Sequence, residues 1–203
     1  MDQYLSFIVL AQGLAAVSGI AYLNGVIRKK ITPNLASWII WSVIGTALYF
    51  TTQASLEASE STKRFALVLA IIPSTIALVS LWFGRFQKIT IYDLVALILA
   101  TLALIWWWKT KNEPTVLPIA LAILADISAL IPTVMGVRRY PESDKPFPWL
   151  CFSFGSILAL FGADNLNFAT LALPIYMAIA PLFVAYPLVQ SCLKRGVAMK
   201  HWI

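Results

Sequence analysis

Seven long apolar runs, separated by short polar segments, dominate the pattern of this chain. They cover approximately residues 5–27, 35–52, 65–83, 90–108, 116–137, 149–163 and 168–193. About 20 predominantly apolar residues are enough for a helix to cross the hydrocarbon core of a bilayer. The pattern therefore predicts an all-α membrane protein with seven transmembrane helices.

Composition agrees with a lipid environment. Of the 203 residues, 60% are hydrophobic and 12% are charged, whereas a soluble domain is about half apolar and roughly a quarter charged. The net charge is +6, but the basic residues lie between the apolar runs or at their ends. This placement indicates membrane topology, so we expect the lipid bilayer, and no nucleic acid, as a partner.

The basic residues also predict an orientation. The loops after the first, third and fifth runs and the C-terminal segment hold most of them: Arg28, Lys29, Lys30, Arg85, Lys88, Arg138, Arg139, Lys145, Lys194, Arg195 and Lys200. The opposite face holds only Lys63, Arg64, Lys109 and Lys111. Because cytoplasmic loops are enriched in Lys and Arg, we expect a multi-pass protein of the cell inner membrane with its N-terminus outside and its C-terminus in the cytoplasm.

The chain contains an internal repeat. Residues 10–50 align without gaps on residues 121–161 at an offset of 111, with nine identities that include Trp38/Trp149 and Ser42/Ser153. A second block, Ala70 to Pro73 with Ala77, recurs at an offset of 108 as Ala178 to Pro181 with Ala185. Duplicated membrane units are typical of carriers whose substrate site lies between the two halves.

The repeat and the orientation together predict the domain organisation. Residues 1–86 form a first three-helix repeat, residues 87–112 a linker transmembrane helix, and residues 113–203 a second three-helix repeat. Because one additional helix restores the direction of the chain, the two repeats are parallel. The fourth run is apolar on all sides apart from Asp93, which is typical of a peripheral helix.

Asp126 is the principal candidate for chemistry, because it falls in the middle of the fifth apolar run. Intramembrane acids usually face a cavity or a partner. Two stripes of small or polar residues at helical spacing predict helix faces that meet each other or a shared cavity: Ala122, Asp126, Ala129, Thr133 and Ala11, Ala15, Ser18, Tyr22. Two interpretations remain open for Asp126: it binds a proton, a cation or a polar substrate group, or it only bonds a neighbouring helix.

Other polar and aromatic side chains extend this candidate site. Gln12, Ser18, Tyr22, Thr133 and Tyr176 are expected to add hydrogen bonds in a cavity, with interhelical packing as the alternative for each. Trp38 and Trp149, with Trp41, begin the second and sixth runs, where they form either an aromatic wall and gate or interfacial anchors. The equivalent prolines Pro73 and Pro181 interrupt helices, as paired hinges or as static kinks.

Several kinds of chemistry lack the residues they need. The only histidine, His201, is near the C-terminus, and no Cys/His/carboxylate group has metal-ligand spacing. No Ser-His-Asp set and no glycine-rich phosphate loop are present. We therefore expect no enzyme activity, no metal and no cofactor.

The architecture resembles the PQ-loop/SWEET superfamily. The resemblance lies in the three-plus-one-plus-three helices, in the basic loop and helix start from Arg28 to Trp38, and in their second copy from Arg138 to Trp149. The chain has no Pro-Gln dipeptide, so it looks like a divergent member. Pro33 to Trp41 also resembles the Pro-Asn-x-x-Ser-Trp-x-x-Trp signature of a group of bacterial seven-helix proteins.

The resemblance implies sugar uniporters, amino-acid exporters or a sorting receptor. Our first hypothesis is a secondary transporter or facilitator of a small polar solute, sugar-like or amino-acid-like, coupled to protons through Asp126. The alternative is a non-transporting seven-helix receptor or sensor. By analogy with the superfamily, we also expect a homo-oligomer.

Overall fold

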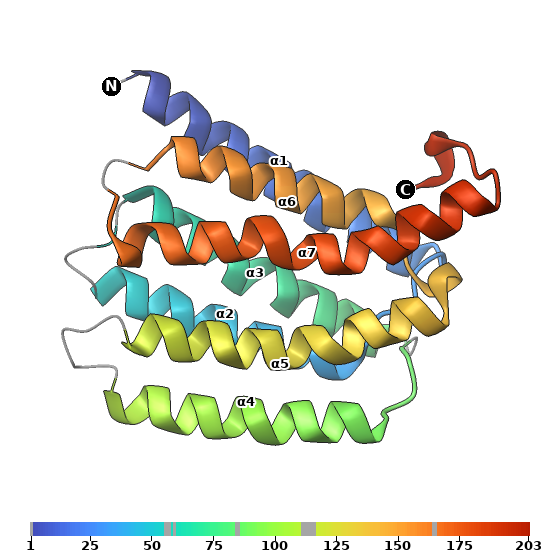
Figure 1. The fold of residues 1–203 in the computed structure, drawn as a ribbon, viewed down its shortest axis with the longest axis horizontal. Helices are drawn as coiled ribbons and strands as arrows, with labels where there is room; N and C mark the ends of the chain where they lie inside the picture. Colours follow the sequence, from blue (N-terminus) through green and yellow to red (C-terminus); the bar gives the residue numbers. More distant parts are fainter. Residues whose placement is uncertain (1, 55–57, 59, 84–85, 111–116, 164–165) are drawn as a thin grey trace.

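A computed structural model describes residues 2–54, 58, 60–83, 86–110, 117–163 and 166–203. In this part of the chain there is no strand, and seven α-helices run along a common bundle (Figure 1). Their bounds are α1 Asp2–Ile27, α2 Leu35–Ala54, α3 Glu60–Trp82, α4 Ile91–Thr110, α5 Leu117–Arg139, α6 Pro146–Phe161 and α7 Phe168–Lys194. Two short 3-10 turns follow α5 and α7: η1 Pro141–Ser143 and η2 Met199–His201.

Five of these helices are long and apolar enough to cross a membrane. The qualifying segments are Ser6–Ile27, Thr62–Trp82, Ile91–Thr110, Ile119–Arg139 and Phe168–Lys194, and two shorter apolar helices are Leu35–Phe50 and Pro146–Phe161. The composition and the five long segments are compatible with an integral membrane protein. The predicted all-α fold is confirmed for the described residues.

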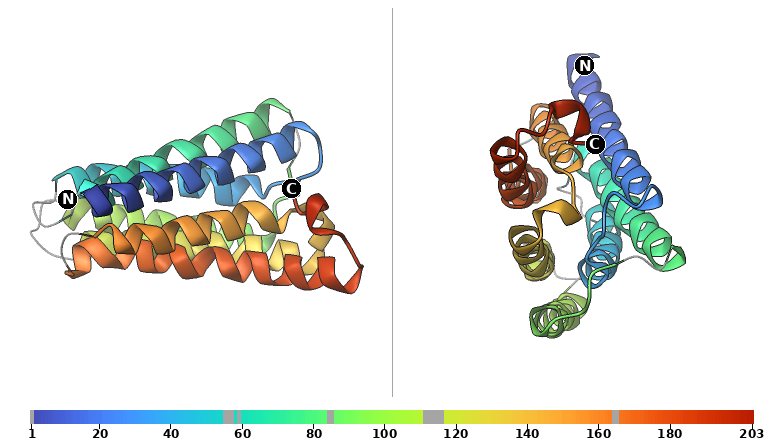
Figure 2. Two further views of the ribbon diagram at one scale, coloured as in Figure 1. Left: turned by 90° about the horizontal axis from the view of Figure 1, so that it is seen from above. Right: turned by 90° about the vertical axis from the view of Figure 1, so that its right-hand side faces the viewer.

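The helices form two groups of three. Helix α3 packs between α1 and α2, and α7 packs between α5 and α6. The groups meet where α1 contacts α6 and where α2 contacts α5. Seen end-on, α1, α2 and α3 lie on one side of the bundle, and α5, α6 and α7 lie on the other (Figure 2).

Helix α4 lies at one edge of the bundle, where it packs on α5 and more lightly on α2. Its start is fixed by Asp93, whose Oδ2 accepts hydrogen bonds from the backbone N–H and the hydroxyl of Thr90, both at 2.6 Å. Oδ1 of the same side chain accepts a bond from Asn34 at 2.6 Å. Asn34 in turn caps α2 by accepting the N–H of Ser37 at 3.1 Å. One buried acid thus ties the first turn of α4 to the first turn of α2.

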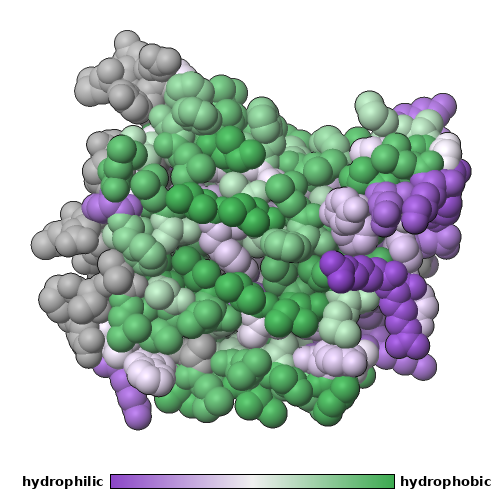
Figure 3. Space-filling model, in the orientation of Figure 1, coloured by the Kyte–Doolittle hydropathy of each residue, from purple (hydrophilic) through white to green (hydrophobic). Residues whose placement is uncertain are grey.

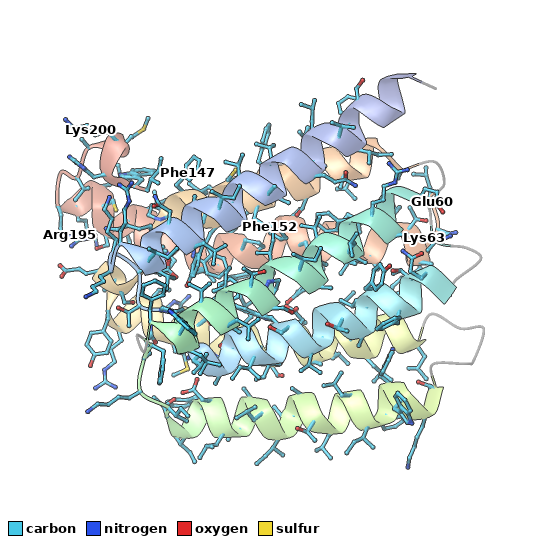
Figure 4. The ribbon with its side chains drawn as sticks, turned by 180° about the vertical axis from the view of Figure 1, so that it is seen from behind. Glu60, Lys63, Phe147, Phe152, Arg195 and Lys200 are labelled. Atoms are coloured by element: carbon cyan, nitrogen blue, oxygen red, sulfur yellow. The ribbon has the colours of Figure 1, made fainter. Side chains whose placement is uncertain are left out.

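The two ends of the bundle differ in charge. The segments at residues 28–34, 86–90 and 140–145 lie at the same end as the C-terminus, which we call the C-terminal end (Figure 1). Hydrophilic surface gathers there, whereas the sides of the helices are mostly hydrophobic (Figure 3). Arg195 and Lys200 lie at this end, and Glu60 and Lys63 lie at the opposite end (Figure 4).

Gln87 ties the three loops of the C-terminal end together. Its backbone N–H donates to the Pro33 carbonyl at 2.9 Å, and its side-chain amide donates to the Thr32 carbonyl at 3.2 Å and to Ser143 Oγ at 3.3 Å. Thr32 N–H also donates to the Ser143 carbonyl at 2.7 Å. The two groups of helices are therefore joined at this end by hydrogen bonds of the segment that leads into α4.

Candidate functional site

A cavity of about 80 Å³ lies between the two groups of helices. At about 10–15 Å³ for each water of this measure, it has room for roughly five to eight water-sized groups. Helices α1, α2, α3, α5, α6 and α7 all contribute to its lining, which consists of Ser18, Gly19, Tyr22, Trp38, Trp41, Gly45, Leu48, Val68, Leu69, Ile72, Pro73, Ile76, Asp126, Leu130, Pro148, Trp149, Phe152, Met177, Ala180 and Pro181. Phe152 lies about midway along the bundle (Figure 4).

More than half of the lining residues are in pairs related by the sequence offsets of the repeat. Three pairs are 111 positions apart: Gly19/Leu130, Trp38/Trp149 and Trp41/Phe152. Three more are 108 positions apart: Leu69/Met177, Ile72/Ala180 and Pro73/Pro181. Equivalent positions of the two groups of helices therefore face the same cavity.

Four aromatic rings form a cluster between the middle of the cavity and the C-terminal end. The ring centroids of Tyr22 and Trp38 are 4.7 Å apart, and those of Trp38 and Trp41 are 5.0 Å apart. Trp149 lies 5.8–6.0 Å from each of the other three rings. The three indoles are only 6–8% exposed, which favours a place inside the bundle over anchoring at a membrane interface.

Asp144, in the segment between η1 and α6, is hydrogen-bonded to this cluster. Tyr22 donates its hydroxyl proton to Asp144 Oδ2 at 3.3 Å and accepts a hydrogen bond from Trp38 Nε1 at 3.2 Å. The backbone N–H of Lys145 donates to the other carboxylate oxygen at 2.6 Å. The Trp149 indole N–H also lies near this carboxylate, but it is buried without a hydrogen bond of normal geometry.

Burial changes the acidity of Asp144, whose side chain is 5% exposed. Loss of hydration raises the pKa of Asp144 from 3.8 to about 7, and the hydrogen bonds from Lys145 and Tyr22, with the charge of Lys145, oppose that rise only in part. The carboxyl that holds the aromatic cluster thus titrates near neutral pH.

Asp126 reaches the same cavity from α5. Tyr176 of α7 donates its hydroxyl proton to Asp126 Oδ2 at 2.6 Å, and Trp41 donates its indole N–H to the backbone carbonyl of Asp126 at 3.4 Å. The Trp41 indole N–H also lies near the Asp126 carboxyl group itself. Both interpretations of Asp126 are therefore compatible with its surroundings, because it bonds a neighbouring helix and also lines a cavity.

Two buried serines link the groups of helices at equivalent positions. Ser18 Oγ of α1 donates to the Pro148 carbonyl of α6 at 2.7 Å, and Ser37 Oγ of α2 donates to the Ala129 carbonyl of α5 at 2.8 Å. Ser18 and Ala129 are 111 positions apart, as are Ser37 and Pro148. The two hydrogen bonds therefore join equivalent pairs of positions. The serine donor belongs to the first helix of its group in one bond and to the second helix of its group in the other.

Loss of either serine hydroxyl is expected to weaken the contact between the groups of helices. Ser18→Ala and Ser37→Ala should each lower the free energy of unfolding by about 1 kcal/mol, the usual net value of a buried hydrogen bond. Denaturation in detergent micelles measures the change. Ser74→Ala is the control, because Ser74 Oγ bonds Ala70 O within its own helix at 2.7 Å. An equal loss in that control would contradict a bond specific to the interface.

The structure brings together seven of the ten predicted site residues. Those that line the cavity are Ser18, Tyr22, Trp38, Pro73, Asp126, Trp149 and Pro181. Tyr176 lies behind Asp126 as its hydrogen-bond donor. Gln12 is half-buried on α1 and Thr133 is buried on α5, and neither lines the cavity; Thr133 Oγ1 has no hydrogen-bond partner among the described residues.

All eight residues of the two predicted stripes are buried. The stripes do not pack on each other, because α1 lies against α6 and α3, and α5 lies against α2, α4 and α7. They share the cavity instead, through Ser18 and Tyr22 on one side and Asp126 on the other.

Sequence reasoning missed Asp144 and Phe152. Phe152 had a signal, because it lies 111 positions after Trp41 and takes the equivalent place in the cavity. Asp144 had none, since a lone acid in a polar loop is typical of an exposed turn.

Other site types have less to support them. Among the residues that the structure describes, no three His, Cys, Asp or Glu side chains are grouped to hold a metal ion. Comparison of the chain with protein-family models, with curated proteins and with solved structures found no match.

Proposed function

We propose that this protein is a secondary carrier or facilitator of a small polar solute, built from seven transmembrane helices as two parallel three-helix repeats joined by α4. The observation that carries the proposal is the cavity between the two groups of helices, lined by residue pairs at the repeat offsets. Carriers with duplicated units place their substrate site at such an interface.

The packing order supports the repeat. In each group, the third helix lies between the first and the second, and the first helix of each group contacts the second helix of the other. Apart from α4, exchange of the two groups therefore leaves the main neighbours of each helix unchanged. The serine bonds at equivalent positions follow the same exchange.

Seven spans require the two shorter helices to cross as well. Helix α2 has 20 residues and α6 has 16, which at 1.5 Å for each residue gives about 30 and 24 Å. Both run beside the longer helices (Figure 1). A shortfall of a few ångströms is accommodated by local thinning of the bilayer or by flanking residues.

The aromatic cluster toward the C-terminal end of the cavity supports a gate at that end. The cluster of Tyr22, Trp38 and Trp149 combines residues of both groups of helices and is bonded to Asp144. Relative motion of the two groups would separate these rings and open the cavity toward this end, which we expect to face the cytoplasm because it holds the excess of basic residues. Pro73 and Pro181 both line the cavity and are paired hinge candidates.

Flux into proteoliposomes tests the proposal. Wild-type protein should accumulate one class among a panel of sugars and amino acids with saturable kinetics, and an imposed pH gradient should alter the rate. Asp126→Asn keeps the side-chain shape and an acceptor for Tyr176 but removes the titratable group, so it should fold and lose the entire gradient effect. Glu142→Gln, an exposed acid paired with Arg195 at 2.6 Å, is the control and should behave as wild type.

Two results would count against parts of the proposal. An unchanged pH profile in Asp126→Asn would contradict the role of Asp126 in proton coupling and would leave the proposed carrier function standing. Saturable binding of a solute that is never moved by folded protein would favour the alternative of a receptor or sensor.

A further inference from the structure

We propose that the cavity binds a small organic cation, such as a quaternary or protonated amine with apolar substituents. This inference rests on the proposed function for its physiological meaning, and it narrows the polar solute to one chemical class. The binding itself follows from the charge, the hydrogen-bonding capacity and the aromatic content of the lining, which are considered in turn.

The charge of the lining favours a cation. Among the described residues that line the cavity, Asp126 is the only one with a carboxyl group, and none is Lys, Arg or His. The carboxylate of an anion or of a zwitterionic amino acid would therefore enter an apolar cavity without a counter-charge, which is costly. A cation would instead meet the Asp126 carboxylate, which lines the cavity.

The hydrogen-bonding capacity of the lining disfavours a sugar. Most of its polar groups are already paired within the protein: the hydroxyl of Ser18 with Pro148, the hydroxyl of Tyr22 with Asp144, and the indole N–H groups of Trp38 and Trp41 with Tyr22 and Asp126. A polyol buried here would lose water without finding enough partners for its hydroxyls. A quaternary ammonium group has no N–H donor and needs none of these groups.

The aromatic rings supply what a cation with apolar substituents requires. Tyr22, Trp38, Trp41 and Trp149 all line the cavity, with neighbouring centroids 4.7–6.0 Å apart. The faces of such rings attract a cation within about 6 Å, and tryptophan does so most strongly. Because the rings pack on one another, they form one aromatic wall of the cavity, against which the methyl groups of a choline-like ligand can lie.

The size of the cavity fits a compact ligand. Its 80 Å³ accommodate roughly five to eight water-sized groups, which is about the size of choline and too small for a disaccharide or a peptide. Asp126 and the aromatic cluster lie at the same cavity, so one ligand can place its charged head against the carboxylate and its methyl groups against the rings.

Equilibrium binding of labelled choline to the purified full chain in detergent tests the inference. Its neutral isostere 3,3-dimethylbutan-1-ol has the same shape without the charge, and glycine betaine adds a carboxylate. We expect saturable choline binding, with both competitors at least tenfold weaker. Asp126→Asn should weaken choline binding at least tenfold and leave the isostere unchanged, while Glu142→Gln should bind choline as wild type does.

The aromatic contribution is tested separately. Trp149→Phe keeps an aromatic face and should retain choline binding within about threefold, whereas Trp149→Leu should lose at least tenfold. Elution as a single folded species and an unchanged response to the neutral isostere show that these variants keep the cavity. Equal affinity for choline and its isostere, or equal losses in both Trp149 variants, would overturn the inference.

The outcomes also separate this inference from the proposed function. Choline that binds but does not cross the bilayer of proteoliposomes would support the cation site and contradict the proposed carrier function. Uptake of a sugar or an amino acid by protein that does not bind choline would support the carrier and overturn the cation site.

Discussion

Replacement of Gly45 by alanine is expected to lower the free energy of unfolding by about 2–3 kcal/mol, the range of an overpacked core. Gly45 lies in α2 against the backbone carbonyl of Leu69 in α3, and an added Cβ would overlap that oxygen. Pro73, four residues after Leu69, has no N–H to bond this carbonyl within α3. The two helices therefore meet backbone to backbone, where no flexible side chain can move aside.

Gly13→Ala is the matched control for this effect. No atom lies within 4 Å of a Cβ added at Gly13, so the same change in a helix should leave stability unchanged or raise it by up to about 1 kcal/mol through helix propensity. Midpoints of denaturation in detergent compare the two variants. A Gly45→Ala protein as stable as Gly13→Ala would show that α2 and α3 separate at little cost.

The stability of the wild-type protein is expected to fall as the pH rises through the range from 3.8 to about 7. The folded state binds the Asp144 proton more tightly than the unfolded state, because burial raises the pKa of Asp144 to about 7. The stabilisation is therefore fully present below about pH 4 and is lost above pH 7. At 1.36 kcal/mol for each pKa unit, the whole change is about 4 kcal/mol.

Asp144→Asn should remove the part of this slope that Asp144 contributes, because the amide resembles the protonated carboxyl and does not titrate. Thermal unfolding in detergent at several pH values between 5 and 8 measures it. Glu142→Gln changes a nearby but exposed acid and should keep the wild-type slope. An undiminished slope in Asp144→Asn would assign the pH dependence to another group.

The sequence predicted the helices well because their apolar runs are long and their ends carry polar or helix-breaking residues. The turn before α2 is an example: Asn34 caps that helix and bonds Asp93, Ser37 bonds the Ala129 carbonyl of α5, and Trp38 and Trp41 line the cavity. Each conspicuous polar or aromatic residue of this segment therefore has a distinct contact in the fold.

What the sequence could not show was which helices are neighbours. Helical spacing places Ala122, Asp126 and Thr133 on one face of α5, but the pattern does not say whether that face meets α1 or α2. The close approach of α2 to α3 at Gly45 is likewise a property of backbone geometry that the pattern does not show. For the same reason the role of Asp144 was invisible, since its burial depends on how the segment after η1 packs against Tyr22.

The odd number of helices also restricts how copies of this protein can be linked. The N-terminus and the C-terminus lie at opposite ends of the bundle (Figure 1). A tandem dimer made by joining the C-terminus of one copy to the N-terminus of the next would need a connector as long as the bundle. In the proposed seven-span arrangement, two copies with the same orientation in a bilayer would need an apolar helix as that connector, which is the place that we propose for α4 between the two groups within one chain.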